Sequence, residues 1–368
     1  MKNKLLLPIF LFCFYICTAQ TDTKLNPTLA AIDNFLASLS PEQTKVAHLS
    51  FSDSSRLKWS NLPMEETTRQ GIQFKDLSDS QKIKVHVILR TVLSQQGYQK
   101  IMFIMQYDEE LHLRMATANN ELARKYGANN YFVTVFSNHP AAFSHRQMAG
   151  VPQKNKADEI KLLSENVPSG FKFEGHHISI NLTFSPTGEV LTCTPLFTGV
   201  NPAFSATGLN AGKYIMADEN ELGKELFNSL SPALQKKATQ DVIPHETDVF
   251  LERSKRKMES GEFKSFQFDM TSGISYNEMN TAQHNLIKKI IQSWVGNFRE
   301  DIAAKNTKKI LTGINTHPDK MRFTWLGTND VEQLHYYRLQ SPEFIIEFTT
   351  RDQGLYHLHT LWRMSDEK

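Results

Sequence analysis

Two short stretches rich in histidine decide how this sequence folds: Phe173-Glu174-Gly175-His176-His177-Ile178-Ser179-Ile180-Asn181-Leu182 and Leu355-Tyr356-His357-Leu358-His359-Thr360-Leu361-Trp362-Arg363. Four of the thirteen histidines lie in them. Both stretches favour β-strands, in which successive side chains point to opposite faces. His357, His359 and Arg363 are therefore predicted to share one face, whereas His176 and His177 point to different faces.

The same alternation separates the two histidines of the first stretch. His177 shares a face with Ser179 and Asn181, whereas His176 shares one with apolar residues such as Ile178. A polar face is the better candidate for the wall of a site, so His177 is the preferred metal ligand. Ser179 and Asn181 are candidate substrate-binding residues beside it. His176 lies at the mouth of the strand and stays a further candidate ligand.

The beginning of the chain is typical of a secretory signal peptide over residues 1–19. Met1-Lys2-Asn3-Lys4 is basic, residues 5–16 are apolar, and Cys17-Thr18-Ala19 ends the segment with small side chains. A secreted or periplasmic protein is therefore expected. No later stretch reaches the roughly 18 unbroken apolar residues of a membrane span. Removal of the signal would leave Cys193 as the only cysteine, so no internal disulfide is expected.

Residues 20–368 suit a single large domain. The formal net charge is +2, which offers no basic field for nucleic acid, and a small-molecule partner is expected instead. Four helix starts share one pattern, in which a small polar cap precedes a glutamine three or four residues on. They begin at Ser40, Ser78, Ser231 and Asn280. The repetition suggests an internal duplication with halves 20–212 and 213–368, although capping boxes are common in any helical protein.

The remaining patterns predict antiparallel strands in the second half of the chain and a surface excursion over residues 137–172, a tolerated insertion rather than a lid. Residues 199–212 are rich in Gly, Asn and Pro and are expected to form a loop. Asp352-Gln353-Gly354 is interpreted as a three-residue hairpin loop, which places Glu347 opposite His359. Together these features predict an α+β fold, in which an antiparallel β-sheet with histidine hairpins packs against capped α-helices.

Four ordered motifs resemble those of the domain of unknown function 3500 family, over nearly all of the chain. They are Gly175-His176-His177-Ile178-Ser179-Ile180-Asn181, Pro195-Leu196-Phe197-Thr198-Gly199-Val200-Asn201-Pro202-Ala203, Tyr336-Tyr337-Arg338-Leu339-Gln340-Ser341-Pro342 with Ile346-Glu347-Phe348, and His357-Leu358-His359-Thr360-Leu361-Trp362-Arg363. Members of that family are mostly secreted or periplasmic bacterial proteins, and the family label implies no activity. The family often continues with an acidic-Tyr-Gly tail, which this chain lacks.

Imidazoles two residues apart on a strand can both bind one metal ion when a neighbouring strand supplies a third ligand. Zinc-like divalent ions accept imidazole nitrogen and carboxylate oxygen. The candidate ligands are His177, His357, His359 and His176, with Glu347 as a ligand or general base. The alternative is that the histidines only make hydrogen bonds within the sheet.

Further candidates surround this set. Arg363 and Arg338 could clamp an anionic group, or form salt bridges only, and Tyr337 could stack on a substrate. The sequence thus predicts a divalent-metal-dependent hydrolase or lyase acting on a small or carbohydrate-like extracellular molecule. The alternative is a non-catalytic binding protein with structural histidines.

Overall fold

The computed structural model describes residues 26–138, 167–205, 210–240, 271–327, 334–351 and 357–365. The helices are α1 (Pro27–Leu36), α2 (Pro41–Ala47), α3 (Asp79–Val92), α4 (Gln95–Thr117), α6 (Ala217–Asn228), α7 (Pro232–Ala238), α8 (Thr281–Val295) and α9 (Glu300–Thr316). The strands are β1 (His48–Leu49), β2 (Ile72–Gln73), β3 (Phe132–Phe136), β4 (Ser169–Glu174), β5 (Ile178–Phe184), β6 (Val190–Thr192), β7 (Leu196–Val200), β8 (Ile274–Ser275), β9 (Arg322–Gly327), β10 (His335–Gln340), β11 (Phe344–Thr350) and β12 (Leu358–Met364).

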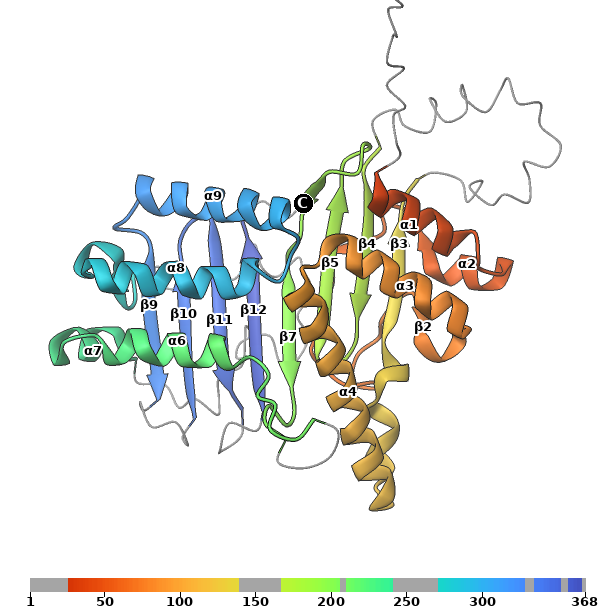
Figure 1. Ribbon diagram of the computed structural model, residues 1–368, viewed down its shortest axis with the longest axis horizontal. Coiled ribbons are helices and arrows are strands. Elements are labelled where there is room, and N and C mark those ends of the chain that lie inside the picture. Colours follow the sequence, from red (N-terminus) through yellow and green to blue (C-terminus); the bar gives the residue numbers. More distant parts are fainter. Residues whose placement is uncertain are drawn as a thin grey trace, which may run out of the picture.

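These strands form one mixed sheet that runs through both halves of the chain, in the order β1-β3-β4-β5-β7-β12-β11-β10-β9-β8, with β2 beside β3 and β6 beside β5. The pairing of β1 with β3 is parallel, and the other pairs of named strands are antiparallel. The helices cover one side of the sheet: α1, α3 and α4 lie over β3 to β5, and α6, α8 and α9 lie over β9 to β12 (Figure 1). The predicted α+β class is confirmed.

The two faces of the sheet differ in chemistry because side chains alternate along each strand. The face under the helices is apolar, and residues such as Ile180 and Trp362 belong to the hydrophobic core. The opposite face carries polar and charged side chains, and we call it the polar face. Lys172, Glu347 and Arg363 lie on it with only 2% of their surface exposed. A charged side chain is rarely buried unless it is paired, so this face needs polar partners.

The capping boxes expected from the sequence form at Ser40, Ser78 and Asn280, where each cap side chain accepts from the backbone N–H three residues on. Ser231 caps α7 through the N–H of Leu234 without completing a box. Helix α9 is a feature that the sequence analysis missed. None of the helices in the described ranges has the length and apolar character needed to cross a membrane.

Both halves follow the same order of elements. A short strand, a 3₁₀ turn and two helices occur as β2, Phe74–Asp76, α3 and α4, and again as β8, Tyr276–Glu278, α8 and α9. A glycine with positive φ precedes each short strand, at Gly71 and Gly273. The halves join where β7 pairs with β12, and the hydroxyl oxygens of Thr198 and Thr360 lie 2.7 Å apart there. A common origin of the halves stays a prediction.

Some local expectations need correction. His176 and His177 lie in the turn between β4 and β5 rather than within a strand. Gly199 and Val200, expected in a loop, belong to β7. The signal peptide falls outside the described residues, as do most of the predicted excursion and the Asp352-Gln353-Gly354 turn.

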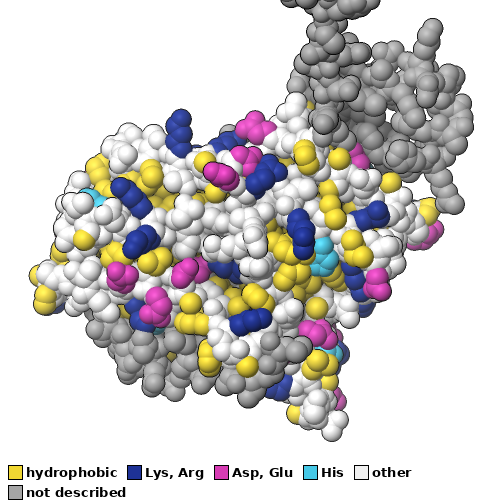
Figure 2. Space-filling model, viewed as in Figure 1, with side chains coloured by type: hydrophobic (Ala, Val, Ile, Leu, Met, Phe, Trp, Pro, Cys, Tyr) yellow, Lys and Arg dark blue, Asp and Glu magenta, His cyan; other side chains and the backbone are white. Residues whose placement is uncertain are grey.

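On the helix-covered side, side chains of both charges are interspersed (Figure 2).

Candidate metal centre

Three imidazoles meet where the two halves of the sheet join. His177 comes from the turn before β5, His359 lies on β12, and His357 lies directly before β12. Nε2 of His357 is 3.3 Å from Nε2 of His177 and 3.0 Å from Nε2 of His359. The three ligand atoms all lie within 4.8 Å of one another. The convergence expected of these three histidines is therefore present, and we call them the histidine cluster.

A glycine makes this convergence sterically feasible. Gly199 of β7 pairs with His359, and its N–H donates to the carbonyl of His177 at 2.7 Å. A Cβ atom at position 199 would lie 2.7 Å from Cδ2 of both His177 and His359. Because real Cβ atoms do not approach other atoms so closely, only glycine leaves room for both rings at their present positions.

A buried carboxylate orients one member of the cluster. Asp108 of α4 is fully buried, and its Oδ1 lies 2.6 Å from Nδ1 of His177. Its Oδ2 accepts a hydrogen bond of 2.6 Å from the Tyr131 hydroxyl. We assign the hydrogen of His177 to Nδ1, facing the carboxylate, so that Nε2 presents its lone pair to His357. Imidazoles that bind metals are held by carboxylates in this way.

The protonation states suit ligand binding. Burial, together with the charge of His176, lowers the pKa of His177 to about 3. Burial alone would raise the pKa of Asp108, but the contacts with His177 and His176 hold it below its usual value. At neutral pH the pair therefore consists of a neutral imidazole and an ionised carboxylate. A neutral imidazole is the form that binds a metal ion.

The contacts between the three Nε2 atoms do not all fit as hydrogen bonds. Because Nε2 of His177 carries a lone pair, the contact with His357 requires a hydrogen on Nε2 of His357. That single hydrogen cannot point at His177 and His359 at once. A tetrahedral ion with metal–nitrogen bonds of about 2.0–2.1 Å places its ligand nitrogens roughly 3.3 Å apart. The observed separations of 3.0 and 3.3 Å fit that spacing.

Asp108, His176 and His177 form a second group of potential ligand atoms. The distance of 2.6 Å between Asp108 and His177 is that of a hydrogen bond, and is too short for two ligands of one ion. His176 stacks on His177 with ring centroids 3.6 Å apart, packs against Tyr126, and has Nδ1 3.5 Å from Asp108. The structure thus places His176 beside the cluster, where it restrains the ring of His177.

Glu347 does not lie opposite His359. Thr349 pairs with His359, and Glu347 pairs with Leu361, so the predicted register is wrong by two residues. Leu358 pairs with Thr350, so the connection between β11 and β12 is longer than the three-residue loop assumed from the sequence. Glu347 stays on the polar face and accepts a hydrogen bond of 2.5 Å from the Tyr336 hydroxyl.

The two predicted arginines lie near Glu347. Arg338 pairs with Glu347 across the β10–β11 ladder and donates to the Ser272 hydroxyl at 3.3 Å. Arg363 is two residues along β12 from Leu361, on the face that carries Glu347. These charged residues form a group on the polar face next to the histidine cluster.

The predicted substrate-binding residues fall on different faces. Ser179 and Asn181 lie on the polar face, and the Asn181 amide donates to Ser179 Oγ at 3.0 Å and to the carbonyl of Pro195 at 2.7 Å. Tyr337 points the other way, where its hydroxyl donates to the carbonyl of Glu219 at 2.5 Å. Its ring packs against Gly223 of α6. Tyr337 is a core residue, and the substrate role proposed for it is wrong.

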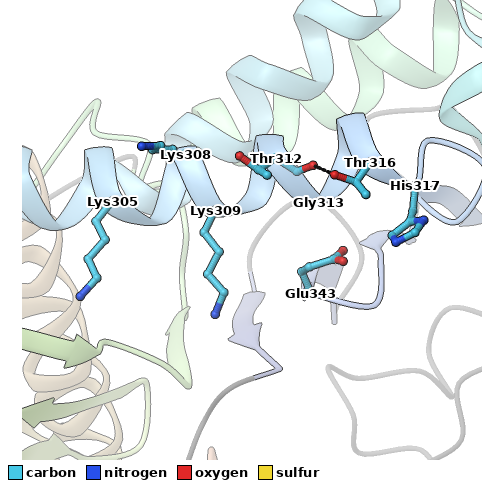
Figure 3. A pocket seen from close by; sticks show the side chains of 8 residues that line it. All are labelled: Lys305, Lys308, Lys309, Thr312, Gly313, Thr316, His317 and Glu343. Carbon is cyan, nitrogen blue, oxygen red and sulfur yellow. Dashed lines mark hydrogen bonds between the residues drawn. The ribbon is translucent and has the colours of Figure 1, made fainter.

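A pocket of about 430 Å³ lies along α9, where Lys305 and Lys309 extend on the side of Glu343 (Figure 3). Lys305 forms an ion pair of 2.7 Å with Glu189. The carbonyl of Glu343 accepts from the N–H of Ser365, which places this pocket at the end of β12 remote from the histidine cluster. The pocket is therefore no part of the candidate metal centre.

We expect Asp108→Asn to weaken metal binding while the fold is kept. An asparagine can still accept from His177 through Oδ1, but it no longer raises the basicity of that ring. Loss of such an outer partner typically costs about 10–100-fold in metal affinity. Competition titrations with a chelator, on wild type and variant, measure the difference. Equal affinities would show that the carboxylate charge does not act on the cluster.

The sheet of this α+β protein holds three convergent imidazoles, and one of them is hydrogen-bonded to a buried carboxylate. These features define the class of the protein, which is an α+β protein with a candidate metal centre. Within that class, the chain is a member of the family described as "Protein of unknown function (DUF3500)", whose model matches residues 21–368. The family resemblance inferred from the four motifs is thus confirmed. Searches of curated proteins and of solved structures find no match to this chain.

Proposed function

We propose that this chain is an exported, divalent-metal-dependent enzyme, a hydrolase or lyase acting on a small or carbohydrate-like molecule. The observation that carries the proposal is the meeting of three Nε2 atoms, from His177, His357 and His359, with His177 oriented by Asp108. Three protein ligands and one open position are the usual arrangement of catalytic zinc sites. The N-terminal sequence pattern supports export.

A zinc-like ion held there would supply a Lewis acid that activates water or polarises a substrate oxygen. The chain's own residues set the conditions for that chemistry. Asp108 fixes the tautomer of His177, and Gly199 leaves space for the rings. Arg338 and Arg363 lie on the same face, and the role we propose for them is to orient an anionic group of a substrate or intermediate. Glu347 is hydrogen-bonded to Tyr336, so we place it in that neighbouring group rather than among the ligands.

The second candidate function is non-catalytic binding. The deep burial of the cluster favours it, since His177 and His359 are only 0% and 3% exposed. His357 is the member with intermediate exposure, so access from solvent would have to pass over its ring. An enzyme and a binding protein differ in one measurable respect, which is turnover that depends on the metal ion.

Metal-dependent turnover tests the proposal directly. Chelator-treated protein is assayed against chromogenic glycosides and small esters, before and after addition of Zn²⁺, Mn²⁺ or Co²⁺. We expect hydrolysis to return only with metal, and His357→Ala to lower the restored rate by at least about 100-fold, since ligand geometry decides the rate. His317→Ala, at the end of α9, is the control. Metal-loaded protein without turnover would favour the second candidate, and turnover that survives chelation would overturn the dependence on metal.

A further inference from the structure

A second pocket, of about 660 Å³, lies against the polar face in the first half of the chain. Its volume falls within the range of roughly 300–1,000 Å³ typical of ligand sites. Its wall contains Trp59, Arg69 and Glu174, and every other lining side chain is polar or charged. A pocket with this wall suits a ligand that forms many hydrogen bonds.

The pocket adjoins the histidine cluster. Glu174 ends β4, two residues before His176, and Nη2 of Arg69 donates to the carbonyl of Gly175 at 2.8 Å. On the other side, Trp59 stacks on Phe197 at 5.5 Å, and Phe197 contacts the His359 ring edge-on at 5.2 Å. One wall of the pocket therefore borders the turn that carries His177 and is connected to His359 through Phe197.

Buried cations fix the loop that forms the pocket. The Lys172 ammonium donates to the carbonyls of Ser55 and Lys58. Arg69 donates through Nη2 to the carbonyls of Ser60 and Leu62, at 3.0 and 2.6 Å. Both cations thus satisfy loop carbonyls that would otherwise lack donors, and the wall is held in place before any ligand binds.

Three buried donor atoms in this wall have no hydrogen-bond partner among the described residues. They are Nε and Nη1 of Arg69 and Nε1 of Trp59. The Arg69 side chain is only 2% exposed, and its Nε lies 4.0 Å from Glu174, beyond hydrogen-bonding distance. Buried polar groups are almost always hydrogen-bonded, so an unpartnered donor in a pocket wall indicates where a ligand supplies an acceptor.

The Glu174 carboxylate, the acceptor in this wall, and the nearby Arg69 together disfavour most charged ligands. Within the described ranges, the cations nearest to the Glu174 carboxylate are Lys172 and Arg69, and both lie 4.0 Å away, beyond hydrogen-bonding distance. An anionic ligand would satisfy the donors but meet the negative charge of Glu174, and a cation would meet the positive charge of Arg69. A hydroxyl group both accepts and donates, so it can satisfy Arg69, Trp59 and Glu174 together.

We propose that this pocket binds a neutral carbohydrate, with Arg69 and Trp59 donating to its oxygen atoms and Glu174 accepting from its hydroxyl groups. The assignment deepens the proposed function by naming the substrate class, and to that extent it rests on it. Binding itself does not require the metal ion, so the two proposals can fail separately.

Calorimetry on chelator-treated wild type tests the inference, with maltose, cellobiose, lactose, mannobiose and chitobiose as neutral probes and digalacturonate as the anionic one. We expect at least one neutral disaccharide to bind at millimolar concentration or better, and digalacturonate to bind at least 10-fold more weakly. The full-length His357→Ala variant should bind the neutral probe equally well, which separates the pocket from the metal centre.

The Glu174→Gln variant tests whether Glu174 contacts the ligand, because a merely structural role of Glu174 would not change which ligand the pocket prefers. This substitution should lower the affinity for the neutral disaccharide by about 10-fold and raise the affinity for digalacturonate by a similar factor. The reason is that it removes the charge that repels the anion and keeps the shape of the side chain. Glu65→Gln is the matched control, since Glu65 also lines the pocket but is paired with Arg124 at 2.8 Å. Absence of neutral-disaccharide binding by wild type, or unchanged selectivity in Glu174→Gln, would overturn the inference.

Discussion

Protein purified without a histidine tag should carry close to one divalent metal ion per chain, and a His357→Ala/His359→Ala double variant should carry almost none. The variant keeps one of the three convergent imidazoles, and a single imidazole does not hold a divalent ion. Even an outer partner of a ligand is worth about 10–100-fold in metal affinity, so loss of two direct ligands should cost more than about 1,000-fold. Elemental analysis of both proteins after dialysis measures the metal content.

The double variant needs a control for histidine content as such. His112 and His317 are half-buried and lie outside the cluster, and Nδ1 of His112 is 2.8 Å from the Ala123 carbonyl. A His112→Ala/His317→Ala variant should therefore keep its metal. Equal and negligible metal in wild type and in the cluster variant, with both folded by circular dichroism, would remove the metal centre and leave the histidines as structural residues.

Local signals in the sequence predict much of this fold because they act over a few residues. The box at Ser78 closes within one helical turn, where the Ser78 N–H donates to Gln81 Oε1 at 2.9 Å. Alternation within 177–181 likewise places His177 and Asn181 on the polar face before any partner strand is known. Such signals depend on nearest neighbours only.

Asp108 was missed because its partner lies 69 residues away in the sequence. A signal was nevertheless present. Ile101, Ile104 and Leu111 form the buried stripe of α4, and Asp108 occupies the position in that stripe four residues after Ile104. A carboxylate at a position predicted to be buried requires a partner, and in a sequence with paired histidines an imidazole is a natural one.

The register of β11 and β12 shows where counting along the sequence fails. The predicted pairing of Glu347 with His359 depended on the length of one loop. The loop is longer than that prediction assumed. The N–H of Arg351 donates to the carbonyl of His357 at 2.7 Å, and the paired residues of the two strands begin with Thr350 and Leu358. A shift of two residues keeps each side chain on its face but changes its neighbours. The face of Glu347 was therefore predicted correctly, and its partner was not.

Gly199→Ala should disrupt the metal centre without removing any ligand. The added methyl group would stand 2.7 Å from Cδ2 of His177 and of His359, so at least one ring must move. Displacement of a ligand by about 1 Å at a reacting centre can cost on the order of 100-fold, and metal affinity should fall by a similar factor. The overpacked ring should also lower the free energy of unfolding by about 1–3 kcal/mol. Chelator competition and urea denaturation measure the two effects.

The loss of metal affinity must be separated from the loss of stability, and a substitution at Gly170 offers the comparison. It lies on β4 of the same sheet, and an added Cβ would meet Leu182 O at 3.3 Å and Arg56 Cδ at 3.4 Å, with no imidazole among its nearest atoms. Gly170→Ala should therefore crowd the sheet and keep full metal affinity. If Gly199→Ala binds metal as tightly as Gly170→Ala, then the rings have room to spare. In that case the closeness of the three Nε2 atoms does not depend on the glycine between their strands.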